Sequence, residues 1–342
     1  MQKNKVIVIA GPTASGKTSL SIKLAKQING EIISADSMQI YKYMDIGTAK
    51  PSIEEQDGIK HYLLDFVMPD ERYSVAEFKK DAENAIEEII AKGKIPIIVG
   101  GTGLYIDSLI YGIEYPKIEY DEEYRNELMK IAETEEGLKS LYEKAKEIDS
   151  DAIIKISEND KKRIMRILEI YNSTGKTKTE LEIESRKKGV KYDYRVFAIN
   201  MNREKLYERI NKRVDIMLEQ GLIEEVKNVI AKFDKFPTAM QGLGYKEVVD
   251  YLNGSYSEEE MIEIIKMETR RYAKRQLTWF RKNKEITWID GLNDAQNNIY
   301  IIFYICLSIY PYCLFVFSKP SKLSFSISSW LLFYFLYHFF FR

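Results

Sequence analysis

The pattern G-x-x-x-x-G-K-[ST] at residues 11–18 is the feature that most constrains how this chain can fold. It follows an uninterrupted apolar run at residues 6–10, which predicts a buried strand, and it precedes a helical pattern that continues to about Ile28. Glycines let successive backbone N–H groups of such a loop face an anion, and the helix N-terminus adds partial positive charge. We therefore expect a strand, a loop and a helix that bind phosphate through Gly11, Pro12, Thr13, Ala14, Ser15, Gly16, Lys17 and Thr18.

Two side chains of this loop carry the expected chemistry. Lys17 would reach the terminal phosphate oxygens, and the Thr18 hydroxyl would bind Mg²⁺. The other interpretation is a glycine turn that binds nothing, which the flanking strand and helix make the weaker one. The pattern predicts a diphosphate or triphosphate ligand and does not choose between them.

Four further strands and a long helix are predicted after the loop. Short apolar runs at residues 31–34, 94–99, 195–199 and 285–289 predict strands, and residues 75–91 predict a helix. Apolar strands that alternate with helices are typical of a parallel sheet covered on both faces. We therefore predict an α/β fold with a P-loop NTPase-like parallel sheet core.

The middle of the chain has a different character. Residues 116–193 are rich in charge, helical in pattern and poor in buried-strand signals. We predict an inserted, mainly helical lobe there, with the core formed by residues 1–115 and 194–297. A chain of 342 residues is long enough to hold both parts.

The tail at residues 298–342 is anomalous. Its two stretches without Asp, Glu, Lys or Arg are 299–317, which Pro311 interrupts, and 324–341, which contains His338. They have the length and apolarity of a membrane hairpin with a turn at residues 318–323. A reading-frame shift in an AT-rich gene would yield the same mixture of Phe, Tyr, Ile, Leu and Ser. Both interpretations stay open.

Charge and cysteine content limit the class of protein. The formal net charge is −1, so any nucleic-acid surface must be a local concentration of Lys and Arg. Both cysteines, Cys306 and Cys313, lie in the tail, which excludes a disulfide scaffold or a Cys-based zinc site in the body. The N-terminal apolar run is too short for a signal peptide. We expect a cytoplasmic protein.

Two polar segments follow predicted strands. D-S-M-Q-I-Y begins at Asp36 after the second strand, and G-G-T-G-L-Y begins at Gly100 after the third. Because ligands bind at the carboxyl ends of strands in an open α/β sheet, both segments should lie beside the phosphate loop. A carboxylate there can accept a proton from a nucleophile. On spacing alone, Asp36 could equally be a kinase-type metal or base residue, an N-cap or a salt-bridge partner.

Six motifs occur in an order that resembles one family. They are G-P-T-A-S-G-K-T, D-S-M-Q-I-Y, M-D-I-G-T-A-K-P at residues 44–51, G-G-T-G-L-Y, G-L-G-Y-K-E at residues 242–247, and K-R-Q-L-T-W-F-R at residues 274–281. Together, over about residues 5–290, they strongly resemble bacterial tRNA dimethylallyltransferase, also called tRNA isopentenyltransferase. Motifs of this length make chance agreement negligible.

The resemblance implies prenyl transfer to tRNA. This family moves a dimethylallyl group from dimethylallyl diphosphate to N6 of the adenine immediately 3′ of the anticodon, which forms N6-isopentenyladenosine and releases diphosphate. Its phosphate loop holds the donor's diphosphate, with Mg²⁺, rather than ATP. By motif, Asp36 would take the N6 proton, Thr102 would touch the tRNA at the channel, and Arg213 would lie near the diphosphate.

The resemblance also implies a set of tRNA contacts. By motif, they are Asp36, Ser37, Met38, Gln39, Thr102, Arg125, Asp160, Lys161, Lys162, Arg163 and Ile164. The family often has Arg at the position of Lys162, which puts a bidentate phosphate contact there in doubt, though not the charge. The expected partners are tRNA and dimethylallyl diphosphate. No protein partner is evident, a monomer is expected, and membrane association would come only through the tail.

A second basic cluster lies near the end of the body. It could grip the anticodon stem backbone, or it could be a solvated helix face with Trp279 packed in the core. His61, the only histidine of the body, is more simply a structural or exposed residue. The basic cluster consists of Arg270, Arg271, Lys274 and Arg275.

Three other functions compete with this interpretation. A small-molecule or nucleoside kinase shares the fold and the loop, but it needs an ATP-adenine pocket and lid arginines. An isopentenyltransferase that acts on free adenine nucleotides would have little use for the basic helical lobe. A membrane-tethered nucleotide-binding switch is suggested only by the tail.

Overall fold

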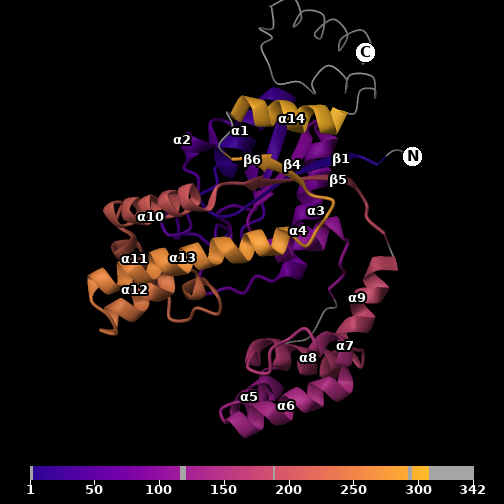
Figure 1. Ribbon diagram of the computed structural model, residues 1–342, viewed down its shortest axis with the longest axis vertical. Coiled ribbons are helices and arrows are strands. Elements are labelled where there is room, and N and C mark those ends of the chain that lie inside the picture. The colour runs from indigo at the N-terminus through magenta and orange to yellow at the C-terminus, as the bar shows by residue number, and fades with distance from the viewer. Residues whose placement is uncertain (1–2, 116–120, 188, 292–294, 308–342) are drawn as a thin grey trace, which may run out of the picture. The chain divides into compact units, whose positions relative to one another are not determined.

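A six-stranded parallel sheet forms the core of the α/β part of the chain (Figure 1). The structure, a computed structural model, describes residues 3–115, 121–187, 189–291 and 295–307. The strand order is β3-β2-β4-β1-β5-β6, and every neighbouring pair is parallel. The strands are β1 (Lys5–Ala10), β2 (Gly30–Ser34), β3 (His61–Tyr62), β4 (Ile95–Gly100), β5 (Asp193–Asn200) and β6 (Thr287–Asp290). The predicted α/β fold with a parallel sheet is confirmed.

Helices cover both faces of this sheet. The connection from β1 to β2 runs through α1 (Lys17–Ile28), and the connection from β2 to β4 runs through α3 (Val75–Ala91). These two crossovers run in opposite directions across the sheet, so their right-handedness places α1 and α3 on opposite faces. The short helices α2 (Ile53–Gln56) and α4 (Gly103–Ile110) complete the first half of the chain.

The alternation of side chains in β1 explains how both faces are buried. Val6, Val8 and Ala10 pack in one cluster with α3 and α4, while Ile7 and Ile9 point to the other face and are also buried. A strand that is apolar on both faces belongs at the centre of a parallel sheet. Since β1 leads directly into the phosphate loop, the loop stands on the most buried part of the sheet.

The segment between α4 and β5 is helical, as predicted. Among its described residues there is no strand, and its helices enclose a small apolar core of their own that includes Leu128, Leu141 and Ile164. In Figure 1, α5 to α8 gather into one group. The helices are α5 (Glu122–Ile131), α6 (Glu135–Ile148), α7 (Ser150–Ile153), α8 (Lys161–Thr174) and α9 (Lys178–Lys187).

The chain after β5 is again mostly helical, and α13 is its longest element. Met261 and Ile265 near the start of α13 pack in an apolar cluster with α11 and α12, whereas Phe280 at its end packs with the sheet. The helices α10 and α13 lie side by side (Figure 1). The elements are α10 (Arg203–Glu219), α11 (Leu222–Lys232), the 3-10 helix η1 (Ala239–Gln241), α12 (Tyr245–Leu252) and α13 (Glu258–Phe280).

The last described element is α14 (Ala295–Leu307). By contact density the chain divides into two compact units, Met1–Ile302 and Phe303–Arg342. Ile299 and Ile302 are buried in the first unit, so the predicted start of the tail at residue 298 falls inside α14, in the part of this helix that belongs to the first unit. In the part of the chain that the structure describes, no helix combines the length and apolarity needed to span a membrane. Most of the predicted membrane hairpin or frameshifted segment, residues 308–342, lies outside the described residues.

Candidate functional site

The loop between β1 and α1 has the backbone of an anion site. Gly11, Ala14 and Gly16 have φ angles of 150°, 59° and 91°. Gly16 is the N-cap of α1 and provides no side-chain cap, so the first N–H groups of the helix remain available to a ligand. Ser15 is only 3 % exposed, and its buried hydroxyl has no hydrogen-bond partner among the described residues. A buried hydroxyl without a partner is costly unless a ligand supplies one.

Basic side chains converge on this loop. Lys17 Nζ donates to Pro12 O at 2.7 Å. Burial lowers the pKa of Lys17 to about 8; attraction to Asp36 opposes the shift, and repulsion from Arg213 adds to it. Arg213 of α10 donates to Thr13 Oγ1 at 3.4 Å, and burial, with repulsion from Arg209, lowers its pKa as well. A bound anion would favour the charged forms of these buried cations.

Arg209 is a loop-facing residue that the sequence analysis did not single out. It lies one helical turn before Arg213, and its Nη2 is 3.5 Å from where a Cβ on Gly16 would stand. None of the hydrogen bonds or ion pairs among the described residues engages its guanidinium. The sequence did carry a signal for Arg209, because arginines four residues apart on a predicted helix lie on the same face.

The lowered pKa of Lys17 predicts a pH dependence for anion binding. A bound diphosphate favours the charged amine, so below pH 8 the affinity is full. Above pH 8 the free protein must take up a proton to bind, and the affinity should fall up to about tenfold per pH unit. The affinity for inorganic diphosphate is measured between about pH 6.5 and 9.5. The Lys17→Met variant shows how much of the pH dependence comes from ionisation of the diphosphate itself. An equal pH dependence in wild type and Lys17→Met would contradict the assignment.

Asp36 lies at the carboxyl end of β2 with one oxygen held and one left open. Its Oδ1 accepts the N–H groups of Met38 at 2.9 Å and Gln39 at 3.4 Å. No hydrogen bond from the described residues reaches its Oδ2. Asp36 is close enough to Lys17 to influence the pKa of that amine. The backbone therefore orients the carboxylate while one oxygen stays available to a substrate.

The segment after β4 meets the Asp36 turn through Thr102. Thr102 Oγ1 accepts the Ser37 N–H at 3.1 Å and lies 3.4 Å from the Ser37 hydroxyl. A Cβ on Gly100 would lie 2.1 Å from Ala35 O, so glycine is required for this close approach of the two segments. The prediction that the D-S-M-Q and G-G-T-G segments meet at one edge of the sheet is confirmed.

Gln276 of α13 joins the two loops, and the sequence analysis did not identify this role. Its Oε1 accepts the Thr13 N–H at 2.9 Å, and its Nε2 donates to Gly101 O at 2.9 Å. The side chain is buried. Because both of its functional groups are used, Gln276 fixes the start of the phosphate loop against the segment after β4. Tyr272, one turn earlier, lies within hydrogen-bonding reach of Thr102 and Gln276, and burial raises the pKa of its hydroxyl.

Removing the Gln276 amide should therefore loosen the loop. Gln276→Leu leaves the Thr13 N–H and the Gly101 carbonyl without their partner, at about 1–3 kcal/mol for each group that stays buried. Gly101→Ala should act on the same contact, because its Cβ would lie 2.1 Å from Gln276 Nε2. Urea unfolding and diphosphate titration of both variants and the double variant measure this. We expect strongly non-additive losses, and additive losses would contradict the shared contact.

The tryptophan of the K-R-Q-L-T-W-F-R motif has a structural role. Trp279 Nε1 donates to Asp107 Oδ2 at 2.9 Å, and a Cβ on Gly103 would lie 2.3 Å from the Trp279 ring. Burial raises the pKa of Asp107, and the Trp279 hydrogen bond opposes that shift. Trp279 thus anchors the start of α4, which supports the interpretation that it packs in the core.

The other basic residues of α13 are divided between internal contacts and the surface. Arg270 donates to Asn211 Oδ1 at 2.7 Å, and Arg271 pairs with Glu268 at 2.5 Å. Lys274 and Arg275 are exposed. Together with Arg271, whose side chain is 59 % exposed, they are the members of the cluster that could contact an RNA backbone, and this contact stays a prediction. His61 Nδ1 donates to Ile59 O at 2.9 Å, and burial lowers the pKa of the imidazole, in keeping with a structural residue.

The predicted tRNA contacts in the helical segment differ in exposure and in the partners that they already have. Arg125 forms an ion pair with Glu169 at 2.8 Å and remains one-third exposed. Lys161, Lys162 and Arg163 are exposed at the start of α8. Lys162 Nζ also donates to Gln241 Oε1 of η1 at 3.3 Å. These basic side chains stand where they could meet a phosphate backbone.

Two members of that predicted set also have structural roles. Asp160 is the N-cap of α8, since its Oδ1 accepts the Arg163 N–H at 3.1 Å, and its Oδ2 pairs with the Arg163 guanidinium at 3.1 Å. Ile164 is 0 % exposed and belongs to the apolar core of this segment. The Ile164 side chain therefore takes no part in a binding surface.

The residues of the loop fit a magnesium ion that is bound mainly through its substrate. Among the described residues, no group of three or more His, Cys, Asp or Glu side chains is arranged to hold a metal. The half-buried Thr18 and the unpartnered Ser15 hydroxyl offer oxygen ligands beside the loop. Mg²⁺ usually keeps several waters and takes few protein ligands beside phosphate oxygens, so this small donor set suits it.

Comparison with known proteins gives one consistent result. The IPP transferase family profile matches residues 39–283. The tRNA dimethylallyltransferase of Acetivibrio thermocellus is 56 % identical over 288 residues, which cover 84 % of this chain and 92 % of that protein.

Solved structures agree with the sequence relatives. The tRNA isopentenylpyrophosphate transferase of Bacillus halodurans is 43 % identical, with a TM-score of 0.66, and the match covers 89 % of this chain and 96 % of that one. A eukaryotic dimethylallyltransferase acting on tRNA is 32 % identical, with a TM-score of 0.73, covering 94 % of this chain and 87 % of that one.

Proposed function

Because the chain belongs to the IPP transferase family, we propose that its phosphate loop binds the diphosphate of a prenyl donor and that Asp36 faces the acceptor. The chain transfers a dimethylallyl group from dimethylallyl diphosphate to N6 of the tRNA adenine immediately 3′ of the anticodon. The products are N6-isopentenyladenosine and diphosphate. The observation that carries the proposed geometry is the convergence of Lys17 and Arg213 on the loop, with the open oxygen of Asp36 close by.

The loop stabilises the leaving group in this reaction. The C–O bond between the allylic carbon and the diphosphate breaks, and negative charge grows on the departing phosphate oxygens. The N–H groups at the start of α1, Lys17 and Arg213 are fixed where that charge develops, so they need little rearrangement. Arg209, which is exposed but lies next to Gly16, adds a further cation beside the loop.

Asp36 and Thr102 act on the acceptor. The lone pair of the adenine N6 amine is delocalised into the ring, so the amine becomes a usable nucleophile only as its proton leaves. As the N6–carbon bond forms, Asp36 Oδ2 accepts that proton, while Oδ1 stays bound to the backbone of residues 38 and 39. Thr102, bonded to Ser37, stands beside the same turn and would contact the tRNA.

Magnesium would be held by Thr18 together with the donor's phosphate oxygens. When bound, it neutralises part of the diphosphate charge. The fit described above supports this assignment, in which the protein supplies few ligands of its own.

The tRNA is proposed to contact both the sheet edge and the helical segment. The target base must leave its stack to reach the loop, which costs less in an anticodon loop than in a duplex. Arg125, Lys161, Lys162 and Arg163 would bind the RNA backbone. We place residues 116–193 in a tRNA-contacting lobe and propose that the enzyme acts as a monomer in the cytoplasm, where its substrate is found. Membrane association would come only through the tail.

The proposed function is tested by locating the modified nucleotide. The protein is incubated with labelled dimethylallyl diphosphate, Mg²⁺ and unmodified tRNA, and the product is digested and analysed by mass spectrometry. We expect the label on the adenine 3′ of the anticodon and none on a tRNA in which that adenine is replaced. Label on free AMP but not on tRNA would instead support an enzyme of free nucleotides.

A further inference from the structure

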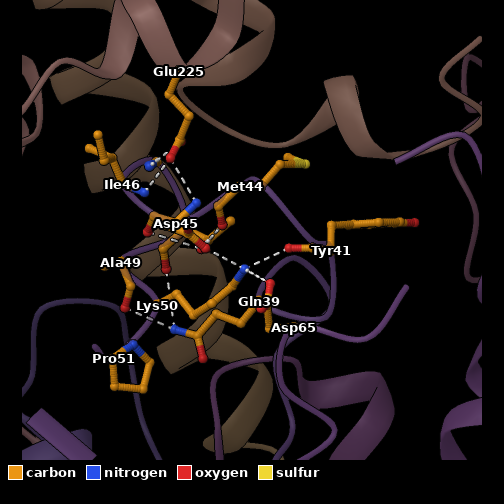
Figure 2. A network of polar contacts seen from close by, with 12 residues as sticks. Gln39, Tyr41, Met44, Asp45, Ile46, Ala49, Lys50, Pro51, Asp65 and Glu225 are labelled. Carbon is orange, nitrogen blue, oxygen red and sulfur yellow. Dashed lines mark hydrogen bonds and ion pairs between the residues drawn. The ribbon is translucent and has the colours of Figure 1, made fainter. Parts of the chain in front are cut away.

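A carboxylate far from the phosphate loop in sequence binds three consecutive backbone N–H groups. Glu225 of α11 accepts the N–H groups of Asp45 at 2.8 Å and Ile46 at 2.7 Å through Oε2, and that of Gly47 at 3.1 Å through Oε1 (Figure 2). Its Oε1 also accepts the Tyr245 hydroxyl at 2.5 Å. Charge-assisted bonds of this kind are stronger than neutral ones, so Glu225 holds the turn at residues 45–47 firmly.

Packing fixes the same turn from another side. A Cβ on Gly47 would lie 2.5 Å from the Tyr245 ring and 2.9 Å from Leu222 Cδ1. Tyr245 is 1 % exposed, and burial, together with the neighbouring Glu225, raises the pKa of its hydroxyl. The G-T-A and G-Y-K-E motifs thus meet in one contact, which leaves no room for a side chain at residue 47.

Lys50 fixes the other end of the segment at residues 45–50. Its Nζ donates to Tyr41 O at 2.7 Å and pairs with Asp45 Oδ1 at 2.6 Å and Asp65 Oδ1 at 2.7 Å (Figure 2). The Lys50 side chain is only 6 % exposed. A buried ammonium with three acceptors uses all of its N–H groups and is not available to a substrate.

Gln39 connects the segment to the turn that carries Asp36. Its Nε2 donates to Thr48 O at 3.2 Å and Ala49 O at 3.1 Å, and its Oε1 accepts the Ser34 hydroxyl at 3.3 Å. Both amide hydrogens are therefore used inside the protein. The Gln39 side chain therefore joins two segments. The Gln39 backbone N–H donates to Asp36 Oδ1.

These contacts form a continuous series of hydrogen bonds and ion pairs from α11 to the acceptor side of the site. We propose that Glu225 and Lys50 are positioning residues that set the Asp36 carboxylate through the 45–50 segment and Gln39. The inference rests on the proposed function, because it assigns a purpose to the Asp36 geometry. It also gives the M-D-I-G-T-A-K-P motif a role that needs no substrate contact.

The proposal predicts a specific kinetic defect. In Glu225→Gln one oxygen is replaced by an NH₂ group, which would face backbone N–H groups that need an acceptor. The turn should shift, and with it Gln39 and Asp36, while the phosphate loop is untouched. We expect kcat to fall roughly 10- to 100-fold, as small misplacements of reacting groups do, with the KM for dimethylallyl diphosphate unchanged within about twofold.

The matched control is Glu224→Gln, one residue earlier on the same helix. Glu224 is exposed and pairs only with Lys227 among the described residues, so its replacement should leave kcat unchanged. Inorganic diphosphate affinity and thermal unfolding are measured for both variants. Because Glu225→Gln removes a strong contact, the variant is first shown to be folded. If it does not fold, Gln39→Met breaks the same series of contacts at its other end.

A double-mutant cycle tests whether the contacts of Glu225 and Gln39 act together on the Asp36 carboxylate. The kcat losses of Glu225→Gln and Gln39→Met should be clearly less than multiplicative when combined, because both break the same chain of contacts. Multiplicative losses, or a Glu225→Gln loss that appears only in the donor KM, would overturn the proposal. A wild-type protein without transfer to tRNA would instead refute the proposed function and leave the contacts as observed.

Discussion

Asp36→Asn is expected to lower kcat for tRNA prenylation by roughly 10²–10⁴-fold, the usual contribution of a general base. The asparagine oxygen can still accept the N–H groups of Met38 and Gln39, so the turn should keep its shape. The variant loses the carboxylate oxygen that would take the N6 proton. Single-turnover transfer of the labelled dimethylallyl group measures the effect without product release.

Donor binding is the control for this variant. Asp36 stands near Lys17, so its neutralisation removes a negative charge from the neighbourhood of the diphosphate. The affinity for inorganic diphosphate should therefore stay the same or increase. Full activity of Asp36→Asn would show that another group, or the solvent, removes the proton.

Arg213→Met is expected to lower kcat/KM by about 10²–10³-fold, as loss of a fixed transition-state charge partner does. Arg213 is half-buried and touches Thr13 at 3.4 Å, so its guanidinium is held against the phosphate loop before any ligand arrives. The same replacement should weaken product inhibition by diphosphate. Steady-state kinetics with dimethylallyl diphosphate and added diphosphate measure both quantities.

Arg209→Met serves as the comparison on the same helix. Because Arg209 is exposed, water screens its charge, and we expect a smaller loss than for Arg213. Equal losses in the two variants, or no loss in Arg213→Met, would contradict the assignment of Arg213 to the leaving group.

The fold could be predicted where the sequence pattern is local. The strand before the phosphate loop, the helix after it and the helix at Val75–Ala91 follow from apolar runs and helical periodicity, and the structure confirms them. β3 was not predicted, because two residues, His61 and Tyr62, carry no periodicity that could be recognised. It pairs only with β2, at the edge of the sheet.

The contact of Thr102 with Ser37, in the turn that carries Asp36, could also be predicted, since the carboxyl ends of parallel strands share one edge. The contacts made by Gln276 and Glu225 could not. Gln276 bonds to Thr13, 263 residues away, and Glu225 bonds to Gly47, 178 residues away. No local pattern encodes such pairs, because they depend on how α11 and α13 pack against loops of the sheet.

The segment Asp160–Ile164 shows how one pattern can serve two purposes. An Asp before three basic residues is as much a helix N-cap as a binding motif, and here it caps α8. Ile164 lies at an apolar position of the same helix, which favours burial. The exposed Lys161, Lys162 and Arg163 are the part of this segment that charge alone supports as an RNA surface.

The most direct test of the account measures two products in one reaction: the dimethylallyl group gained by tRNA and the diphosphate released. With dimethylallyl diphosphate, Mg²⁺ and unmodified tRNA, we expect one diphosphate for each group transferred and no requirement for ATP. When Asp36 is replaced by Asn, both products should form roughly 10²–10⁴-fold more slowly. Diphosphate release without transfer to tRNA, or turnover of ATP in place of the prenyl donor, would contradict the assignment of the loop to a leaving diphosphate.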